Sequence, residues 1–337
     1  MKWFPREGFL SRIAGLVNEG TRMRHLLSLE DWSPADIAEA IALARAVKAD
    51  PQAYAGTLRG LTLCMIFEKP SLRTRLSFEA GMNQLGGQSI YYDTSTSPIG
   101  AGKETIADTV RTMSRYVDII MARLFKHEDL LEMARHATVP VINGLTNYSH
   151  PGQILADLQT IEEHKGRLAG LKLAYFGDSF NNVTHSLLFG CPKAGMHLAV
   201  ACPPGKAYEP DPAVLAVARA AAEAAGTSIL ITHDAAEAAR DADVVYTDSW
   251  MSYHIPKEQA AERERIFAPY QVTADLMRLA HPDAVFMNCL PAIRGMEQTA
   301  EVMDGPQSVV FDQAENRMHM HKALLLILLR ASGRIMG

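Results

Sequence analysis

The sequence predicts an α/β protein of two open parallel-sheet domains with a cleft between them, and three observations lead to this fold class. The chain has 337 residues, more than a single core usually holds, so two domains of about 150 residues each are expected. Short apolar segments typical of buried strands alternate with helix-like segments along most of the chain. Strands separated by single helices need right-handed crossovers, and such crossovers build parallel sheets.

The first half of the chain opens with a helix signal. Ser33 and Pro34 form a cap followed by a first-turn proline, and apolar residues then recur at helical spacing. After this helix we expect strands over 61–67, 89–92, 117–122 and 139–143, with helices over 74–85, 104–115 and 127–136. This alternation predicts one parallel sheet for the first half.

The second half begins with a long helical stretch over 153–164. Beyond it we expect strands over 171–176, 198–202, 228–232, 243–247, 284–287 and 308–311, and an alanine-rich helix over 211–226. The last helix is expected over about 316–334. It should be buried, because its run 323–329 is apolar nearly all round.

Composition and charge exclude several function classes. A hydrophobic content of 48% with 21% charged residues describes an ordinary soluble globular protein. The net charge of -5 gives no electrostatic reason to bind nucleic acid or an anionic membrane. No apolar run reaches the roughly 20 residues that cross a bilayer, and the N-terminus lacks the features of a secretion signal. We therefore expect a cytoplasmic protein that binds neither nucleic acid nor membrane.

The four cysteines predict neither a zinc site nor a disulfide scaffold, because their spacing and density suit neither. Cys64, Cys191 and Cys202 lie in apolar runs and are expected to be inert core thiols, whereas Cys289 lies in a polar motif. Histidines and carboxylates do not cluster at ligand spacing either. We expect neither a metal nor a cofactor.

A motif rich in hydroxyl and guanidinium groups follows the first expected strand and opens a helix. It reads Ser71-Leu72-Arg73-Thr74-Arg75. Free N–H groups and the positive dipole at a helix start favour phosphate, and arginine adds forked, permanently charged donors. A hydroxyl cap with two solvated arginines is the simpler explanation for an isolated motif of this kind. Polar residues at other strand ends favour the phosphate site, because ligands of open α/β sheets collect there. They are Arg123, Asp248 and Cys289.

Further blocks of the chain carry a resemblance to a known family. They are His150-Pro151-Gly152-Gln153, Asp248-Ser249-Trp250, Asn288-Cys289-Leu290-Pro291-Ala292 with Arg294, and Glu315-Asn316-Arg317. Together with the first motif, these blocks resemble the aspartate and ornithine transcarbamylases, which move a carbamoyl group from carbamoyl phosphate to an amine. Among them the chain looks most like the ornithine carbamoyltransferases. The resemblance runs from about Leu26 to the C-terminus, and it is specific because separated blocks agree in order and spacing.

The resemblance implies a carbamoyl phosphate site with a defined set of residues. They are Ser71, Leu72, Arg73, Thr74, Arg123, His150, Gln153, Arg294 and Arg317. Arg123, His150, Arg294 and Cys289 are the implied catalytic residues. Carbamoyl transfer needs a clamp on the phosphate, donors to the developing oxyanion and a positioned neutral amine, and it needs no covalent intermediate.

The resemblance also implies an ornithine site. Its residues are Asn182, Asp248, Ser252, Tyr253, Cys289 and Leu290. Asp248 is expected to pair with the α-amino group, while the Cys289 side chain and the Leu290 carbonyl lie beside the attacking nitrogen. Asp157, one helical turn after Gln153, is assigned to structure.

The domain division and the assembly follow from the same resemblance. Carbamoyl phosphate would bind to a first domain made of residues 1–150 and the C-terminal helix 316–337, which crosses back to that domain. Ornithine would bind to a second domain made of residues 151–315. The products would be citrulline and phosphate. A homotrimer or a multiple of trimers is implied, with each site borrowing residues from a neighbour.

The sequence departs from the family pattern near the implied site. Leu72 replaces a threonine, Asn288 replaces a histidine, and Tyr253-His254 stand where Met-Gly is usual. The loop that contains Pro98 is one residue longer than usual. These departures leave two alternatives open beside an ordinary ornithine enzyme. One is an acceptor such as putrescine or an N-acylornithine, and the other is an ornithine enzyme that is insensitive to phaseolotoxin.

The sequence leaves one further function class open and disfavours another. A non-catalytic relative that binds the metabolites without turning them over stays open. A nicotinamide-dependent dehydrogenase is disfavoured, because Phe180 and Asn181 stand where a dinucleotide-binding turn needs glycines.

Overall fold

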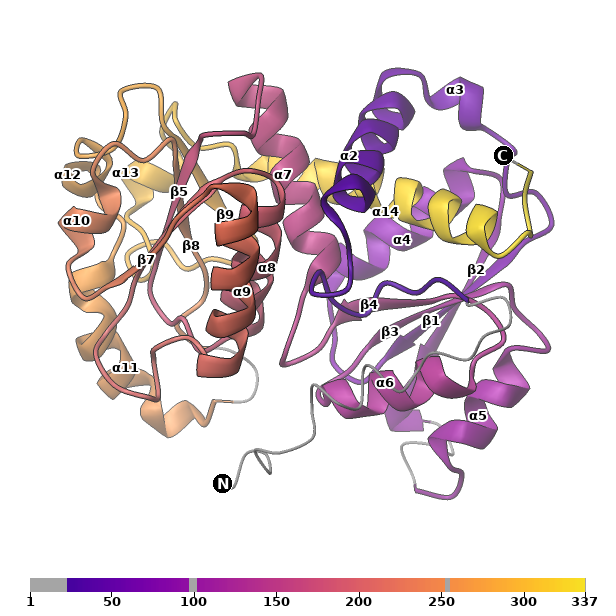
Figure 1. Ribbon diagram of the computed structural model, residues 1–337. Coiled ribbons are helices and arrows are strands. Elements are labelled where there is room, and N and C mark those ends of the chain that lie inside the picture. The colour runs from indigo at the N-terminus through magenta and orange to yellow at the C-terminus, as the bar shows by residue number, and fades with distance from the viewer. Residues whose placement is uncertain (1–22, 97–101, 252–254, 337) are drawn as a thin grey trace.

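The computed structural model describes residues 23–96, 102–251 and 255–336 (Figure 1). It contains two parallel sheets, one in each half of the molecule, and each sheet is flanked by helices. The strand order is β2-β1-β3-β4 in the first sheet and β7-β6-β5-β8-β9 in the second. The predicted fold class of two open parallel-sheet α/β domains is confirmed.

The first sheet and its helices come from the N-terminal half of the chain. The strands are β1 (Thr62–Phe67), β2 (Gln88–Asp93), β3 (Ile119–Arg123) and β4 (Val141–Leu145). The helices are α2 (Pro34–Ala49), α3 (Pro51–Tyr54), α4 (Leu72–Gln84), α5 (Ile106–Met113) and α6 (His127–His136). In β1 and β3 nearly every residue is buried, as is typical of strands with helices on both faces. The strands therefore lie where the apolar runs predict them.

The second sheet and its helices follow in the C-terminal half. The strands are β5 (Lys172–Phe176), β6 (His197–Ala201), β7 (Ile229–Thr232), β8 (Val244–Thr247) and β9 (Val285–Asn288). The helices are α8 (Asn182–Lys193), α9 (Pro212–Ala225), α10 (Ala235–Ala239), α11 (Ala260–Phe267), α12 (Ala274–Met277) and α13 (Ala300–Met303). Asn181 caps α8 by accepting a 2.8 Å hydrogen bond from the Thr184 N–H.

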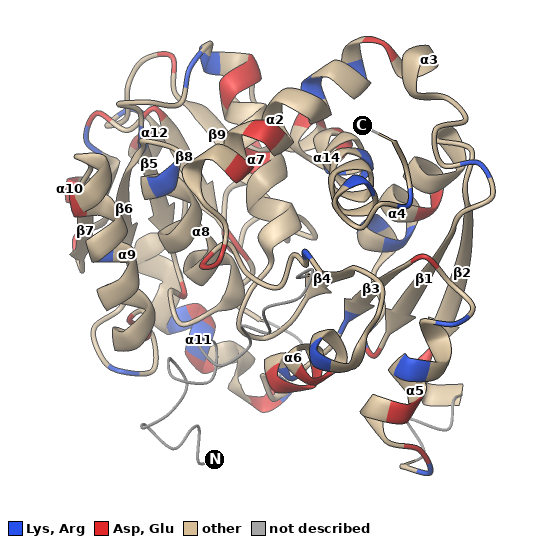
Figure 2. Cartoon of the chain, turned by 45° about the vertical axis from the view of Figure 1, so that its right-hand side comes forward, with Lys and Arg blue, Asp and Glu red and all other residues tan. Residues whose placement is uncertain are grey.

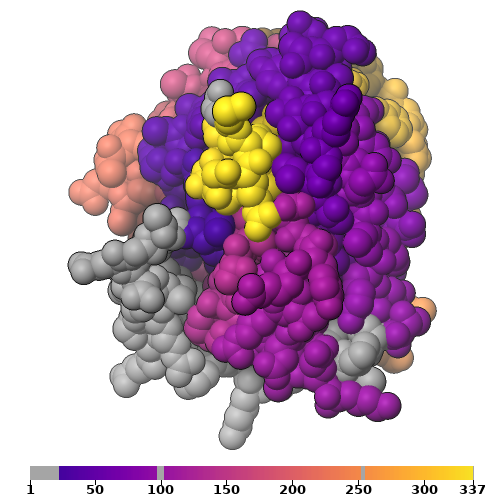
Figure 3. All heavy atoms as spheres, turned by 90° about the vertical axis from the view of Figure 1, so that its right-hand side faces the viewer, coloured from indigo at the N-terminus to yellow at the C-terminus, as the bar shows by residue number. Residues whose placement is uncertain are grey.

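Two long helices join the halves. They are α7 (Pro151–Lys165) and α14 (Val310–Ala331). The C-terminal helix α14 packs against α2, α4 and α7, so the end of the chain returns to the first domain as expected (Figure 1). Figure 3 shows its end, in yellow, set among the indigo and purple segments of the N-terminal half. Its run 323–329 is buried throughout, as the apolar pattern predicts.

The strand predicted over 308–311 is wrong. Ser308 makes only an isolated parallel bridge to Phe286, and the chain then enters α14 at Val310. The Gln313 N–H already donates to the Val309 carbonyl, which starts the helical ladder. A short apolar run cannot distinguish a buried strand from the first turn of a buried helix. Val310 is buried in the core of the second domain in either case.

The described structure shows where the cysteines and the charged residues lie. Cys64, Cys191 and Cys202 are buried and free, and burial raises the pKa of each thiol, which makes them poor nucleophiles. In the view of Figure 2, basic and acidic residues are interspersed over both domains. Within residues 23–96, 102–251 and 255–336, no helix is long and apolar enough to span a membrane.

Candidate active site

The phosphate motif lies at the N-terminus of α4, directly after β1. Ser71 is extended and caps this helix, since its Oγ accepts a 3.2 Å hydrogen bond from the Thr74 N–H. The other N–H groups of a first turn have no partner within the helix, so they are free to bind an anion. Leu72 points its side chain to solvent, with 68% of it exposed. Its contribution to an anion site is therefore limited to the backbone.

Three distant segments converge on the side chain of Thr74. The Arg317 Nη2 on α14 donates to Thr74 Oγ1 at 2.9 Å, and the Arg123 Nη1 at the end of β3 donates to the same oxygen at 3.4 Å. All three side chains are buried. Arg73 lies close enough for its charge to act on Arg317. Two buried guanidiniums and a partly buried third one thus surround the start of α4.

His150 is the N-cap residue of α7, which follows β4, and Gln153 lies in the first turn of this helix. The His150 N–H donates to Ser186 Oγ at 2.8 Å, and this contact ties the turn to α8 of the second domain. The Gln153 Nε2 donates to Asp157 Oδ1 at 2.8 Å. No described residue hydrogen-bonds the buried atoms His150 Nδ1, Gln153 Oε1 or Arg317 Nε. Buried polar groups are almost always paired, so unpaired ones at one place are typical of a ligand site.

The charges in this pocket perturb one another. Burial, together with the nearby charge of Arg73, lowers the pKa of Arg317 to about 10. Burial, followed by the charges of Arg317 and Arg123, lowers the pKa of His150 well below its ordinary value. His150 is consequently neutral at pH 7, whereas Arg317 stays charged. The pocket offers positive charge and a neutral imidazole to an anionic ligand.

A carboxylate and a thiol face each other at the strand ends of the second domain. Asp248 follows β8, Cys289 follows β9, and the Cys289 Sγ donates to Asp248 Oδ1 at 3.1 Å. Burial raises the pKa of Asp248 to about 6, and burial together with Asp248 raises the pKa of Cys289 well above its ordinary value. At pH 7 this pair is mainly a carboxylate beside a protonated thiol. Such a pair can bind an ammonium group, and it does not supply a thiolate nucleophile.

Asp157 hydrogen-bonds residues of three different elements near the site. Its Oδ1 accepts hydrogen bonds from Gln153 and Gln313, both at 2.8 Å, and its Oδ2 accepts one from the Tyr246 hydroxyl at 2.9 Å. Burial raises its pKa to about 6. Asp157 is enclosed by these partners and fixes the orientation of the Gln153 amide.

Two residues expected at the ornithine site have protein partners. The Asn182 Nδ2 donates to the Thr146 carbonyl at 2.7 Å, which leaves its oxygen for a ligand. Leu290 has a positive φ of 58° and donates its N–H to Asn288 Oδ1 at 2.8 Å. Asn288 is buried and supports this turn. Ser252 and Tyr253 lie outside the described residues.

Arg294 is the expected site residue that the structure does not bring to the others. Its side chain is exposed, and its Nε and Nη2 donate to the Asp304 carboxylate at 2.8 and 2.6 Å. A forked pair of this kind satisfies the guanidinium on the surface of the second domain. The expectation that Arg294 joins Arg123 and Arg317 is not met in this conformation.

Sequence reasoning missed Lys69, which lies next to the pocket. It is buried, its Nζ donates to Asn147 Oδ1 at 2.9 Å and lies 4.5 Å from the centroid of the Phe125 ring. Burial, followed by the charge of Arg123, lowers the pKa of Lys69 to about 7. Its position between the end of β1 and the cap Ser71 is the signal that could have identified it.

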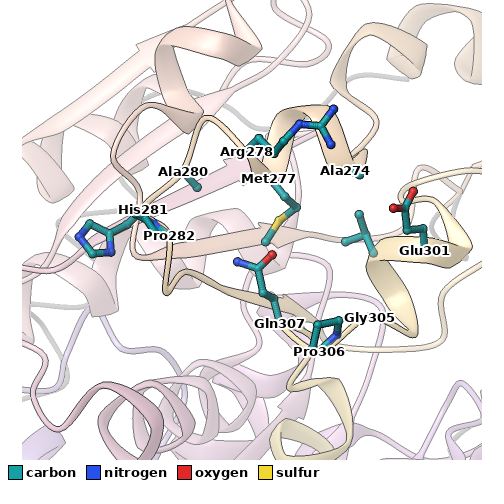
Figure 4. A pocket seen from close by; sticks show the side chains of 11 residues that line it. Ala274, Met277, Arg278, Ala280, His281, Pro282, Glu301, Gly305, Pro306 and Gln307 are labelled. Atoms are coloured by element: carbon teal, nitrogen blue, oxygen red, sulfur yellow. The ribbon is translucent and has the colours of Figure 1, made fainter.

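Two features of the second domain lie away from this site. A surface hollow of about 410 Å³ is lined by residues that include Met277, Arg278, Glu301 and Gln307 (Figure 4). It contains none of the converging residues. A group of three potential metal ligands, Asp243, His281 and Asp283, is also present. In it Asp283 Oδ1 is paired with Lys165 and His281, and Asp243 Oδ2 accepts the Lys172 N–H, so each of the three residues already has a protein partner.

Comparison with known proteins decides the family. Residues 24–163 match the family profile described as aspartate/ornithine carbamoyltransferase, carbamoyl-P binding domain. Residues 169–328 match the profile described as aspartate/ornithine carbamoyltransferase, Asp/Orn binding domain. The chain belongs to the aspartate/ornithine carbamoyltransferase family.

Individual members of this family are similar to the chain over most of its length. The ornithine carbamoyltransferase of Methanothermobacter thermautotrophicus is 52% identical over 90% of this chain and 98% of its own length. That of Carboxydothermus hydrogenoformans is 51% identical over 91% of this chain and 98% of its own length. Among solved structures, the ornithine carbamoyltransferase of Pyrococcus furiosus aligns with a TM-score of 0.86 at 47% identity, and covers 91% of this chain and 97% of its own. The enzyme from Gloeobacter violaceus aligns with a TM-score of 0.81 at 45% identity, over 91% of this chain and 99% of its own.

Proposed function

We propose that this protein transfers the carbamoyl group of carbamoyl phosphate to the side-chain amine of L-ornithine, and forms citrulline and phosphate. One observation carries the proposal: Arg123 and Arg317 meet at Thr74 on the first domain, and the Asp248–Cys289 pair lies on the facing domain. The first group suits a phosphate, and the second suits an amino acid. In the proposed division, residues 1–150 with the C-terminal helix bind carbamoyl phosphate and residues 151–315 bind ornithine.

The phosphate is held by charge and by the start of α4. Arg73, Arg123 and Arg317 supply the positive charge for its two negative ones, and first-turn N–H groups add donors. Thr74 Oγ1 accepts hydrogen bonds from both buried arginines. Its hydroxyl hydrogen therefore remains available to donate to a phosphate oxygen.

The carbamoyl group is oriented by α7. The Gln153 amide nitrogen is engaged by Asp157, so its unpaired oxygen is the atom that can accept from the carbamoyl NH₂. The neutral His150 ring and the Arg123 guanidinium can donate to the carbonyl oxygen, which becomes an oxyanion as the amine attacks. One such transition-state donor is worth about 3 kcal/mol of activation free energy.

The acceptor amine must be neutral when it attacks. Its ordinary pKa lies near ~10.4, and the neighbouring arginines disfavour its ammonium form. Asp248 is placed to accept the α-ammonium group of ornithine. The C–N bond forms as the C–O bond to phosphate breaks, and the proton lost by the attacking nitrogen leaves with the phosphate. No atom of the protein forms a covalent bond during the transfer.

We also propose that the enzyme assembles as a trimer or a multiple of trimers through the first domain. Leu72 and Leu76 lie one turn apart on α4 with 68% and 54% of their surfaces exposed, and Ile90 on the edge strand β2 is 50% exposed. Large apolar groups near an open sheet edge favour association. Light scattering of the wild type and of Leu76→Asp tests this: the variant should lose the trimer mass. We further place the enzyme in arginine biosynthesis and in the cytoplasm, a reducing compartment that suits four free thiols.

The acceptor is tested by a panel of amines at fixed carbamoyl phosphate. Citrulline formation from L-ornithine should exceed carbamoylation of putrescine, lysine and N-acetylornithine. Putrescine keeps a second amine that can pair with Asp248 but lacks the α-carboxylate. Equal or better use of putrescine would therefore mean that the site does not select for an amino acid, and the proposed acceptor would be wrong. No turnover with any amine would favour the non-catalytic alternative.

A further inference from the structure

A buried histidine on α14 makes a contact that the chemistry above does not use. His321 is 2% exposed, and its Nδ1 lies 2.9 Å from the Ser77 Oγ on α4. Its ring stacks on Phe78, with ring centroids 3.8 Å apart and planes 13° from parallel. The stacking fixes the direction of the ring, so the Nδ1 atom has a defined partner.

The hydroxyl of Ser77 decides the direction of that hydrogen bond. Ser77 Oγ lies 2.6 Å from the Arg73 carbonyl and 3.2 Å from the Thr74 carbonyl, both of which are only acceptors. A hydroxyl has one hydrogen, and the short contact to Arg73 uses it. The His321 Nδ1 must therefore carry a hydrogen and donate it to Ser77 Oγ.

The contact lies one helical turn from the phosphate clamp on both helices. Arg317 and His321 are four residues apart on α14, as are Arg73 and Ser77 on α4, so each pair shares a helix face. Arg317 donates to Thr74 Oγ1 on the same side. Two adjacent cross-helix hydrogen bonds thus set how the start of α4 sits on α14.

His321 also lies against the start of α7. A Cβ atom placed on Gly152 would lie 3.2 Å from the His321 Nε2, so a side chain at this position would crowd the imidazole. Gly152 lies between His150 and Gln153, which face the carbamoyl group in the proposed function. The same ring therefore packs on the helix that holds the phosphate and lies close to the start of the helix that orients the carbonyl.

We propose that His321 is a positioning residue, which holds the first turn of α4 in register with Arg317 through the Nδ1–H···Oγ hydrogen bond to Ser77. This inference rests on the proposed function, since it assigns the phosphate clamp to Arg73, Thr74 and Arg317. In this role His321 acts through Ser77 and not on the substrate itself. Burial and the charge of Arg317 lower its pKa well below its ordinary value, so it acts as a neutral donor.

Two matched variants isolate the donor. His321→Asn keeps an N–H group at the place of Nδ1. His321→Leu introduces a side chain with nearly the shape of asparagine but without that group. Both lose the stacking on Phe78, so the difference between them reports the hydrogen bond. We expect a Kd for carbamoyl phosphate about fivefold higher in the leucine variant than in the asparagine variant, the usual worth of one such bond. The KM for ornithine should stay within about twofold of the wild-type value.

If His321 had a purely structural role, the leucine variant should be less impaired in carbamoyl phosphate binding than the asparagine variant. Leucine buries more apolar surface than asparagine, so a variant damaged through stability alone would be milder with leucine. Thermal unfolding of both variants therefore accompanies the binding measurement. In a Ser77→Ala background the acceptor is gone, and His321→Leu should then change the Kd no more than His321→Asn does. Equal Kd values for the two variants in the wild-type background, or a persistent difference in the Ser77→Ala background, would overturn the inference.

Calorimetric titration with carbamoyl phosphate separates this inference from the proposed acceptor. If the wild-type protein binds carbamoyl phosphate but makes no citrulline, the proposed acceptor is wrong, while the comparison of the two variants still decides the role of His321. If the wild-type protein does not bind carbamoyl phosphate at all, the clamp and the positioning role both fail.

Discussion

Replacement of Arg317 by methionine tests the phosphate clamp most directly, because the structure predicts opposite effects on catalysis and on stability. Arg317 is buried, and it donates to Thr74 Oγ1 at 2.9 Å. Methionine fills the volume of the arginine stem and removes the charge and the donors of the guanidinium. Carbamoyl transfer should suffer, whereas the fold should not.

The expected magnitudes follow from the environment of the guanidinium. Loss of one transition-state donor costs about 3 kcal/mol, which corresponds to a fall in kcat/KM of roughly a hundredfold. Burial and the nearby Arg73 lower the pKa of Arg317 to about 10, so the folded protein holds this charge at a cost of roughly 3 kcal/mol relative to water. A group whose protonated form is disfavoured in the folded state reduces stability at every pH below its folded pKa. Its removal should leave the Tm unchanged or raise it.

The assay is steady-state citrulline formation with each substrate varied, together with thermal unfolding of the same samples. Arg330→Met is the matched control, because Arg330 is an exposed arginine near the end of the same helix. The control should keep wild-type kinetics and a similar Tm. A kcat/KM within about tenfold of wild type for Arg317→Met, or an activity loss with a parallel fall in Tm, would refute the clamp as described.

Three further predictions concern the second domain. Asp248→Asn should raise the KM for ornithine about tenfold or more and leave carbamoyl phosphate binding unchanged. Burial raises the pKa of Asp248 to about 6, and below this pH the carboxylate is protonated. The kcat/KM of the wild-type protein for ornithine should therefore fall as the pH drops through about 6. Cys289→Ser should retain activity within about tenfold, because the thiol is protonated and acts as a hydrogen-bond donor; a trapped carbamoyl-enzyme would contradict this. Asp304→Asn should free Arg294 from its forked pair with the Asp304 carboxylate. If the released guanidinium reaches the phosphate, the KM for carbamoyl phosphate should fall. An unchanged KM would mean that Arg294 does not belong to the site.

Most of the fold could be predicted because its strands are short, buried and separated by helices. The apolar runs located β1 to β9 to within about two residues at each end. The run over 308–311 failed, since four apolar or small residues have no periodicity that separates a strand from a helix start. The short helices α10 to α13 of the second domain carried no signal long enough to predict them.

The chemistry of individual site residues was also visible in the chain, because strand ends and helix starts expose polar groups to ligands. The motif at Ser71 to Thr74 and the residues Arg123 and Asp248 fall at such ends, and the structure places them there. Their mutual distances were not visible. Thr74 as the shared acceptor of two arginines depends on how α14 crosses α4.

The sequence by itself determined the alternation of strands and helices and the types of functional group at the strand ends, because these depend on neighbouring residues and on local backbone geometry. The tertiary structure alone decided which of those groups meet. It placed Arg317 beside Thr74, although they are 243 residues apart in the chain, and it paired Arg294 with Asp304 at the surface. It also brought His321 to Ser77 and Lys69 to Asn147. Such contacts arise only when packed helices and sheets fix distant residues in space, and no local pattern encodes them.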